Sequence, residues 1–575
     1  MSGEYLAFTV TFLLLWGVTT QEKGYLYSFT GEDVLKVVAD ACLIAGAPVE
    51  HGQLLHSLTQ IFASDDDKVK FGFIDVDTFK WPHKESLLFG ASDGFRNINN
   101  LKDSLVLFKK IPKDRKCLIT PNIYKTPQFE IYSGQMRAEI VTSFINGHCG
   151  TFRRAPDGRL SNAGLHRKDI LENLHYVHHV SDVSMKDLYR SSFNPLNQSF
   201  IWKQSTTAHL YAHHESCLLD ASQSEECETE YEERNFDECD NLKNSNAPPV
   251  PVIPQCTRLA SPPSEEEFFH EYVKKSRPFI LQNATRNWPA FTRWTNEFLR
   301  EKFGNKSVHI KMTPAGDYEG VERANRWEDF KTFKIPETVK KQLKYPDLVV
   351  VRPAGVNMKF SEFIDMINET AKLPISEREV SAYLEYTSVA EYFQVLEGDV
   401  IEPQFAKDLL TREHLNIWLS DGNTLGRLHF DPYDNLLCQL AGKKEVILFD
   451  PQDNEKLYEG HIPQAELSYD KETRKFRRKT LQDSTALVMS PVDIRNPDLQ
   501  RFPKFLDAHP LNCTIEEGDI LFMPSFWWHE VKSSPSANKP RNLAVNFWYE
   551  PFLTKEFPCE ECLLDVNPAY FDKLD

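Results

Sequence analysis

The chain has 575 residues and a formal net charge of −18 at pH 7. A chain of this length exceeds what one hydrophobic core supports, so two or three domains are expected, and 39 Phe and 10 Trp can fill sizeable cores. The acidic balance argues against a general nucleic-acid binder, which needs a basic face, and against nucleic acid as a partner, but it leaves room for a local basic groove.

An uncharged apolar stretch runs from Leu6 to Thr20. It is short for a membrane span, and the small residues Val18 and Thr20 suit a cleavage site before a polar segment. We predict a secretory signal peptide over residues 1–20, and therefore the lumen of the endoplasmic reticulum or secretion. The residues before the apolar stretch include no Lys or Arg, although signal peptides usually have one there. Two alternatives therefore stay open: a buried strand in a cytoplasmic chain, and an uncleaved anchor. No later segment is apolar enough to span a membrane.

Sequons and cysteines agree with the secretory route without requiring it. The Asn-x-Ser/Thr sequons begin at Asn197, Asn283, Asn305, Asn368 and Asn512. Four of the 11 cysteines lie in or beside an acidic, loop-like stretch: Cys217, Cys227, Cys239 and Cys256. In an oxidising lumen these cysteines could pair, and in a reducing compartment they would be surface thiols. With the signal peptide, we expect a glycoprotein.

Residues 21–153 alternate helical and strand-like segments. The predicted order is helix 49–62, strands 69–77, 104–110 and 129–134, and helix 135–147. This order resembles a thioredoxin-like α/β domain. The redox chemistry of that family is missing, because Cys42 has Ala45 three positions on and Asp103 stands where a cis-proline is usual. We expect a redox-inactive thioredoxin-like module that binds substrate or a partner.

Residues 154–255 are predicted to connect two folded parts. His209 and His213 would share a helical face with Cys217, but no closed set of four zinc ligands appears, so exposed histidines are expected. Residues 225–254 are acidic and then proline-rich, which is typical of an extended, solvated linker.

Residues 256–575 change to short strands separated by turns, after a capped helix near the start, which predicts a β-sandwich or barrel. Within "GRLHFDPYDN", His429 and Asp431 would point from the same face of a strand. His529, in "FMPSFWWHEV", supplies a third ligand. Two His and one carboxylate are the protein ligands of a non-haem iron site that leaves open positions. Lys444, thirteen positions after Asp431, offers a compact positive charge for a carboxylate.

The motifs "RPFILQNATRNWPAFTRW", "HFDPYDNLLCQLAGKKEVILFDP", "LFMPSFWWHEV" and "AVNFWYEP" resemble the cupin-like JmjC oxygenases, in particular their lysyl hydroxylase/peptidase type. The resemblance covers residues 256–575. It implies a double-stranded β-helix (jelly-roll) fold, Fe(II) and 2-oxoglutarate as cofactors, and hydroxylation with release of succinate and CO2. A homodimer through the C-terminal region is a further expectation.

The resemblance assigns seven residues. It implies that His429, Asp431 and His529 bind iron, that Lys444 and Tyr383 bind the 2-oxoglutarate C5 carboxylate, and that Asn435 and Asn546 line the cosubstrate pocket. One position departs from the family pattern. Gly426 stands where relatives often have Thr or Ser, and one hydrogen bond to a charged group contributes about 1.5–3 kcal/mol. Lower cosubstrate affinity is therefore expected, unless Tyr383 or a water compensates.

The resulting hypothesis is a hydroxylase acting on a protein side chain, with lysine one candidate. The alternatives are a tRNA-nucleoside hydroxylase of the same fold and a non-catalytic lumenal binding or scaffold protein. A peptidase would need a second metal set or a nucleophile triad, which is not identifiable, and histone demethylation would need a histone-facing compartment. Cys559 and Cys562 form a single CxxC, which predicts a local disulfide or free thiols rather than zinc.

Overall fold

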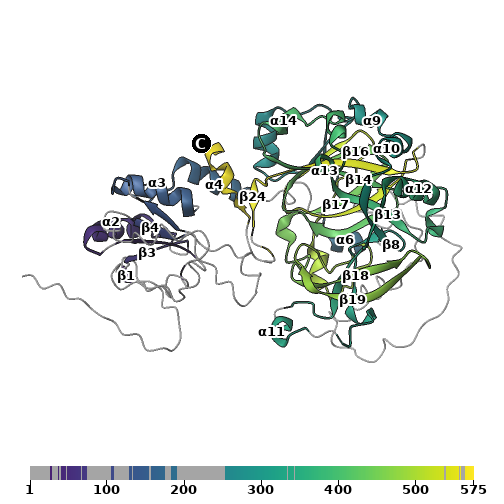
Figure 1. Ribbon diagram of the computed structural model, residues 1–575. Helices are drawn as coiled ribbons and strands as arrows, with labels where there is room; N and C mark the ends of the chain where they lie inside the picture. The colour runs from purple at the N-terminus through teal and green to yellow at the C-terminus, as the bar shows by residue number, and fades with distance from the viewer. Residues whose placement is uncertain are drawn as a thin grey trace, which may run out of the picture. The chain divides into compact units, whose positions relative to one another are not determined.

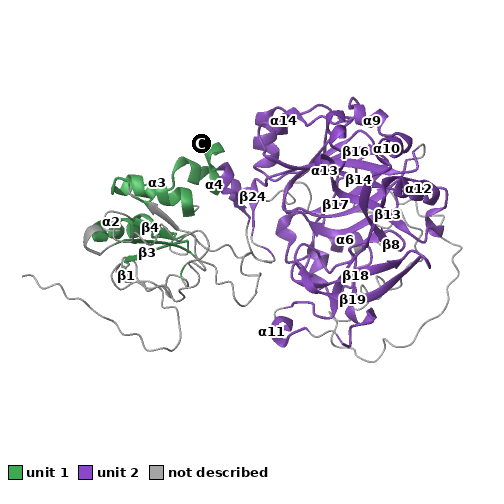
Figure 2. Cartoon of the chain, in the orientation of Figure 1, with its two compact units in different colours: residues 1–168, 571–575 green, residues 169–570 purple. Residues whose placement is uncertain are grey.

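The computed structural model divides into two compact units, residues 1–168 with 571–575, and residues 169–570 (Figure 2). The residues it describes are 26–28, 37, 41–46, 48–65, 68–73, 105–108, 129–132, 134–149, 151–154, 157–174, 183–190 and 253–574, with short gaps at 333–334, 342, 537–538, 556 and 558–563. Several predictions fall outside these residues: the leader 1–20, the His209/His213/Cys217 group, most of the acidic linker, and Cys559 with Cys562. The predicted domain boundaries at 20, 153 and 255 stay predictions.

The first unit contains one five-stranded sheet. Its strands are β1 (Tyr27–Ser28), β2 (Cys42–Gly46), β3 (Val69–Phe73), β4 (Leu105–Phe108) and β5 (Phe129–Tyr132), in the order β1-β3-β2-β4-β5. The pairs β1–β3 and β2–β3 are parallel, and β2–β4 and β4–β5 are antiparallel. The helices are α2 (Pro48–Ile61), α3 (Ala138–Cys149) and α4 (Asn162–Glu172), the last ending in the second unit.

Two helices cover this sheet with apolar side chains. Leu55 and Leu58 of α2 and Val141 and Ile145 of α3 are buried in one cluster with sheet residues such as Cys42. The predicted helices and strands are thus confirmed within the described residues, with shorter strands than expected. Cys42 starts a buried strand instead of standing at the exposed start of a helix, where a redox thiolate would be stabilised.

Two facing sheets form the body of the second unit (Figure 1). The larger sheet consists, in spatial order, of β12 (Ala354–Lys359), β8 (Ser307–Thr313), β13 (Ser381–Ser388), β14 (Arg412–Ser420), β23 (Asn542–Tyr549), β16 (Asp434–Ala441), β21 (Ile520–Met523), β7 (Phe279–Leu281) and β6 (Thr257–Leu259). The smaller sheet consists of β20 (Pro510–Asn512), β17 (Lys443–Phe449), β22 (Trp528–Ser534), β15 (Leu425–Phe430) and β9 (Asp317–Tyr318). Most pairs are antiparallel, but β6–β7 and β9–β15 are parallel.

The core of the second unit lies between the two sheets. Val446 and Leu448 from the smaller sheet share a buried cluster with Leu437, Leu521 and Ala544 from the larger one. Alternating side chains give each strand one face for this core. The predicted jelly-roll architecture is confirmed for this part of the chain.

Further elements extend this framework. A third sheet has the order β10 (Val321–Arg323), β11 (Leu348–Arg352), β18 (Ile462–Asp470) and β19 (Lys475–Ala486), and β24 (Leu553–Thr554) pairs with β25 (Asp565–Val566). The helices are α6 (Met185–Arg190), α8 (Glu265–Glu267), α9 (Pro289–Arg293), α10 (Asn296–Phe303), α11 (Glu337–Lys340), α12 (Phe360–Thr370), α13 (Val389–Tyr392) and α14 (Gln404–Lys407). The predicted helix cap is present, because Ser264 Oγ accepts from the Glu267 N–H at 3.0 Å.

The structure changes two predictions about the middle of the chain. Cys256 forms a disulfide with Cys513, 257 positions away, instead of pairing with a loop cysteine. Met185 and Leu188 of α6, from the predicted connecting region, are buried in the core of the second unit. Among the described residues, no helix is both long and apolar enough to cross a membrane.

Candidate metal centre

The three predicted ligands lie together at one end of the smaller sheet. His429 on β15 and His529 on β22 are direct partners in the antiparallel register, and their ring centroids are 4.2 Å apart. Asp431 Oδ2 lies 3.6 Å from His529 Nε2. One potential ligand atom from each residue lies within 4.8 Å of the others, so a single ion can contact all three.

Backbone carbonyls fix the protonation of both imidazoles. His429 Nδ1 lies 2.7 Å from the Arg427 carbonyl, and His529 Nδ1 lies 2.9 Å from the Trp527 carbonyl. Since a carbonyl only accepts, each Nδ1 carries the proton and each Nε2 keeps a lone pair. Burial, and next the neighbouring His429, hold the pKa of His529 well below its usual range, so His529 stays neutral as a ligand must.

Asp431 reaches the site differently from the prediction. β15 ends at Phe430, so Asp431 is the first residue after the strand and is not on its alternating face. The Phe526 N–H donates to the Asp431 carbonyl at 2.9 Å and holds this turn beside the segment before β22. Burial raises the pKa of the Asp431 carboxyl, while His429 lowers it. A cation at the centre would stabilise the ionised form.

Lys444 provides an isolated positive charge between the sheets. It lies inside β17, and only 3% of its surface is exposed. Its Nζ donates to Ser533 Oγ at 2.9 Å and lies 5.8 Å from the ring centroid of Tyr383. Burial lowers the pKa of Lys444 to about 7. No described carboxylate forms an ion pair with it, which fits a site for an anionic ligand.

Ser533 is a residue that sequence reasoning missed. It pairs directly with Lys444 in the β17–β22 register. It also lies four residues after His529 on the same strand and therefore on the same face, which is the signal that identifies it. A Cβ at Gly426 would meet only the Val531 carbonyl, at 3.8 Å, so a larger residue fits there. Gly426 has no hydroxyl to offer a bound carboxylate, but the Ser533 hydroxyl lies beside Lys444.

The two predicted asparagines lie on the larger sheet opposite. Asn546 Nδ2 donates to Asn435 Oδ1 at 3.2 Å, and Trp418 Nε1 donates to Asn546 Oδ1 at 2.7 Å. The Trp418 ring lies 5.9 Å from that of Tyr383. The structure therefore links both asparagines, through Trp418 and Tyr383, to the surroundings of Lys444.

Two further carboxylates belong to the surroundings of the metal ligands, Glu319 near Asp431 and Glu385 near Glu319. Burial, and then the charge of Glu319, raises the pKa of Glu385 to about 8, and Glu319 also raises the pKa of Asp431 after burial. Glu319 forms an ion pair with Arg352. Glu385 has no ion pair with any described residue. Glu385 thus offers a carboxyl group near Glu319 that is not engaged in an ion pair with the described residues.

An aromatic group of four residues adjoins the same centre. It consists of Tyr386, His414, Tyr433 and Trp548. Tyr433 stacks on Trp548 at 4.6 Å, and Tyr386 lies 5.0 Å from Trp548. Tyr386 is 51% exposed, and its φ of 51° lies in the left-handed region, a strained value for a bulky residue. After burial, the charge of Asp431 raises the pKa of Tyr386, so the two lie near each other.

Comparison with known proteins agrees with this geometry. Residues 265–555 match the cupin-like domain family. The human bifunctional peptidase and (3S)-lysyl hydroxylase JMJD7 is 26% identical over 323 residues, which are 55% of this chain and 87% of that protein. The lysine-specific demethylase JMJ32 of Arabidopsis thaliana is 27% identical over 327 residues, 55% of this chain and 85% of its own. Human tRNA wybutosine-synthesizing protein 5 is 26% identical over 278 residues, 47% of this chain and 71% of its own.

Proposed function

The chain belongs to the cupin-like JmjC family, and from that premise we propose that it is an Fe(II)- and 2-oxoglutarate-dependent oxygenase that hydroxylates a protein side chain. The observation that carries the proposal is the convergence of His429, Asp431 and His529, with both imidazole Nε2 atoms available to a metal. Bound iron would supply the activation of O2, coupled to conversion of 2-oxoglutarate to succinate and CO2.

The chain's own residues would bind and orient the reactants. His429, Asp431 and His529 would hold the metal and leave coordination positions open. Lys444 and Ser533 would bind the distal carboxylate of 2-oxoglutarate, with Tyr383 against the ammonium. An extended strand rises about 3.3 Å per residue, so the backbones of His529 and Ser533 are ~13 Å apart, a separation that their side chains and a five-carbon diacid can span.

The surroundings of the centre support a cationic side chain, such as lysine, as the target. Glu385 offers a carboxyl group without an ion-pair partner among the described residues. The aromatic group adds ring faces, which attract ammonium ions by about 0.5–2 kcal/mol. The net charge of −18 disfavours the tRNA-nucleoside alternative, because a nucleic acid requires a basic face.

Matched peptides test the target class. Peptides that differ at one position, with Lys, Arg, Gln or norleucine, would be incubated with the iron-loaded chain, 2-oxoglutarate and O2. We expect one added oxygen on the Lys peptide, and a rise in KM of about tenfold in Glu385→Gln, because a hydrogen-bonded ion pair is lost. Glu391→Gln, at an exposed position on α13, is the control. Equal oxidation of the norleucine and Lys peptides would refute recognition of the cation.

We also infer a lumenal compartment and a client-binding role for the first unit. The order and directions of β1 to β5 support the thioredoxin-like assignment. The Cys256–Cys513 disulfide supports an oxidising compartment, where such bonds persist. A client protein held by the first unit would have a raised effective concentration at the metal centre. The predicted homodimer stays a prediction.

A further inference from the structure

The strand that carries His429 is interrupted by a bulge directly before that residue. β15 and β22 pair in one register up to Gly426 and in a register shifted by one residue from His429 onward. Arg427 and Leu428 therefore both oppose Glu530. In a regular strand, Arg427 would share a face with His429 and direct its guanidinium toward the metal ligands. The bulge removes this conflict.

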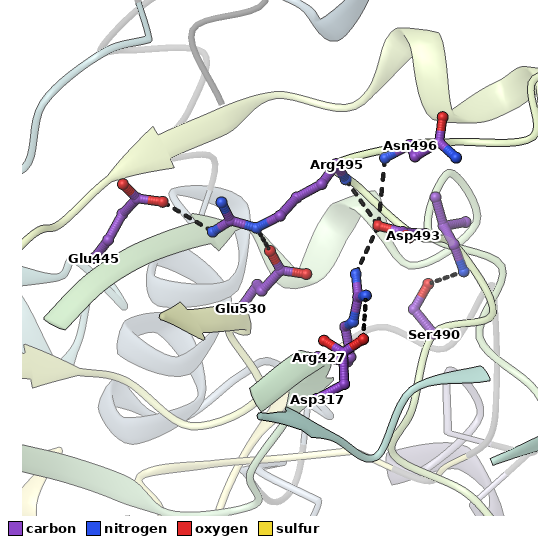
Figure 3. A network of polar contacts seen from close by, with 9 residues as sticks. Asp317, Arg427, Glu445, Ser490, Asp493, Arg495, Asn496 and Glu530 are labelled. Atoms are coloured by element: carbon purple, nitrogen blue, oxygen red, sulfur yellow. Dashed lines mark hydrogen bonds and ion pairs between the residues drawn. The ribbon is translucent and has the colours of Figure 1, made fainter. Parts of the chain in front are cut away.

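Arg427 instead enters a network of charged side chains (Figure 3). Its Nη1 donates to Asp493 Oδ1 at 2.7 Å, and its Nη2 donates to Asp317 Oδ2 at 3.1 Å. Asp493 Oδ1 also accepts from the Arg495 N–H at 3.0 Å. Arg427 is thereby held between β9 and the segment that contains Asp493.

Arg495 anchors the same segment to two further strands. Its Nε donates to Glu530 Oε1 on β22 at 2.5 Å, and its Nη2 donates to Glu445 Oε1 on β17 at 2.8 Å (Figure 3). Glu530 is fully buried and directly follows His529. The two arginines thus connect the segment to three strands of the smaller sheet, β15, β17 and β22.

The segment 488–496, here called the strap, also bonds to the backbone of β15. The Phe430 N–H donates to the Val488 carbonyl at 3.1 Å, and the Ser490 N–H donates to the Leu428 carbonyl at 3.0 Å. An isolated bridge pairs His429 with Met489. His429 is therefore held by β22 on one edge and by the strap on the other.

The link from this network to the metal ligand is a single carbonyl group. The Arg427 carbonyl accepts from His429 Nδ1 at 2.7 Å and so sets the orientation of the imidazole. The side chain of the same residue is fixed by Asp493 and Asp317. We propose that Arg427 is a positioning residue, and that the strap, through Arg427 and Arg495, holds His429 in the orientation that binds the metal.

A purely structural role makes a different prediction. Half-exposed ion pairs contribute about 0–1 kcal/mol to stability, so removing Arg427 would then lower the melting temperature slightly and leave metal affinity unchanged. A positioning role predicts weaker metal binding, because partners that orient metal ligands typically change affinity by about 10–100-fold. The inference rests on the proposed metal site.

Titration with Mn(II) alone separates these roles. The metal-free full chain would be titrated while free Mn(II) is followed by electron paramagnetic resonance. We expect Arg427→Gln to raise the Kd for Mn(II) about tenfold and Arg427→Lys, which keeps the charge, to raise it less. Arg501→Gln is the matched control, because Arg501 forms a similar two-bond ion pair with Asp347 elsewhere in the unit.

The outcomes are distinct. Wild-type protein that binds no Mn(II) would overturn the proposed metal site and the positioning role together. Wild-type protein that binds Mn(II), with Arg427→Gln within twofold of its Kd, would overturn the positioning role alone. Should Arg427→Gln fail to fold, Asp493→Asn keeps the guanidinium and its bond to Asp317, and the same twofold criterion applies to it.

Discussion

Replacing Lys444 with methionine should stabilise the ligand-free chain and remove its binding of 2-oxoglutarate. Burial lowers the pKa of Lys444 from 10.5 to about 7. At 1.36 kcal/mol per pKa unit, this lowering corresponds to roughly 5 kcal/mol by which burial disfavours the ammonium. Methionine fills a similar volume without a charge but loses the hydrogen bond to Ser533, worth about 1.5–3 kcal/mol. The net expected gain is about 2 kcal/mol.

The stability advantage of Lys444→Met over the wild type should decrease as the pH rises. Between about pH 7 and pH 10.5, the unfolded chain keeps the lysine proton that the folded chain has lost. The free energy of unfolding of the wild type therefore rises with pH across this window. The advantage of Lys444→Met should be complete below pH 7 and should shrink as the pH rises toward 10.5.

Thermal unfolding of metal-free protein at pH 6, 7.5 and 9, with and without 2-oxoglutarate, measures both effects. We expect Lys444→Met to melt several degrees above the wild type at pH 6, and 2-oxoglutarate to stabilise only the wild type. Lys443→Met, at the neighbouring half-exposed lysine paired with Glu516, is the control. A Lys444→Met chain that melts below the wild type at pH 6 would refute the inference that the buried, unpaired ammonium of Lys444 destabilises the folded chain.

Three other predictions follow from the same structure and sequence. Gly426→Ser should lower the Kd for 2-oxoglutarate by up to about tenfold, because it adds a hydroxyl for the carboxylate at a position where a Cβ fits and faces the same side as Val531. Weaker binding in calorimetry would contradict this. In an insulin-reduction assay the chain should be inactive, since Cys42 is buried without a second cysteine three positions on; activity that disappears in Cys42→Ser would overturn the redox-inactive assignment. The intact mass of protein from secretory cells, measured with and without glycosidase, should show an N-terminus near Gln21 and at least one glycan. An unprocessed, unglycosylated chain would instead favour the cytoplasmic alternative.

The sequence predicts the metal centre well because its ligands lie in two short segments with recognisable spacing. His429, Asp431 and His529 converge, and Lys444 is buried between the sheets. Ser533 was missed, although its place four residues after His529 on one strand is a local signal.

Features that depend on distant partners could not be predicted. The bulge at Arg427 exists only relative to the register of β22, and Cys256 meets Cys513 only after the fold has brought positions 257 residues apart together. Asp431 lies beyond the strand end because the bond from Phe526 turns the chain there. Each of these contacts is long-range, and a periodicity within one segment carries no information about it.

Succinate formation by the purified full chain with Fe(II), 2-oxoglutarate and O2 tests the central claim most directly. The wild type should bind one Fe(II) per chain and produce succinate, and Asp431→Ala and His529→Ala should do neither, because each removes one of three metal ligands. Iron-loaded wild type that makes no succinate would favour the non-catalytic binding protein, and either variant with full turnover would contradict the assigned centre.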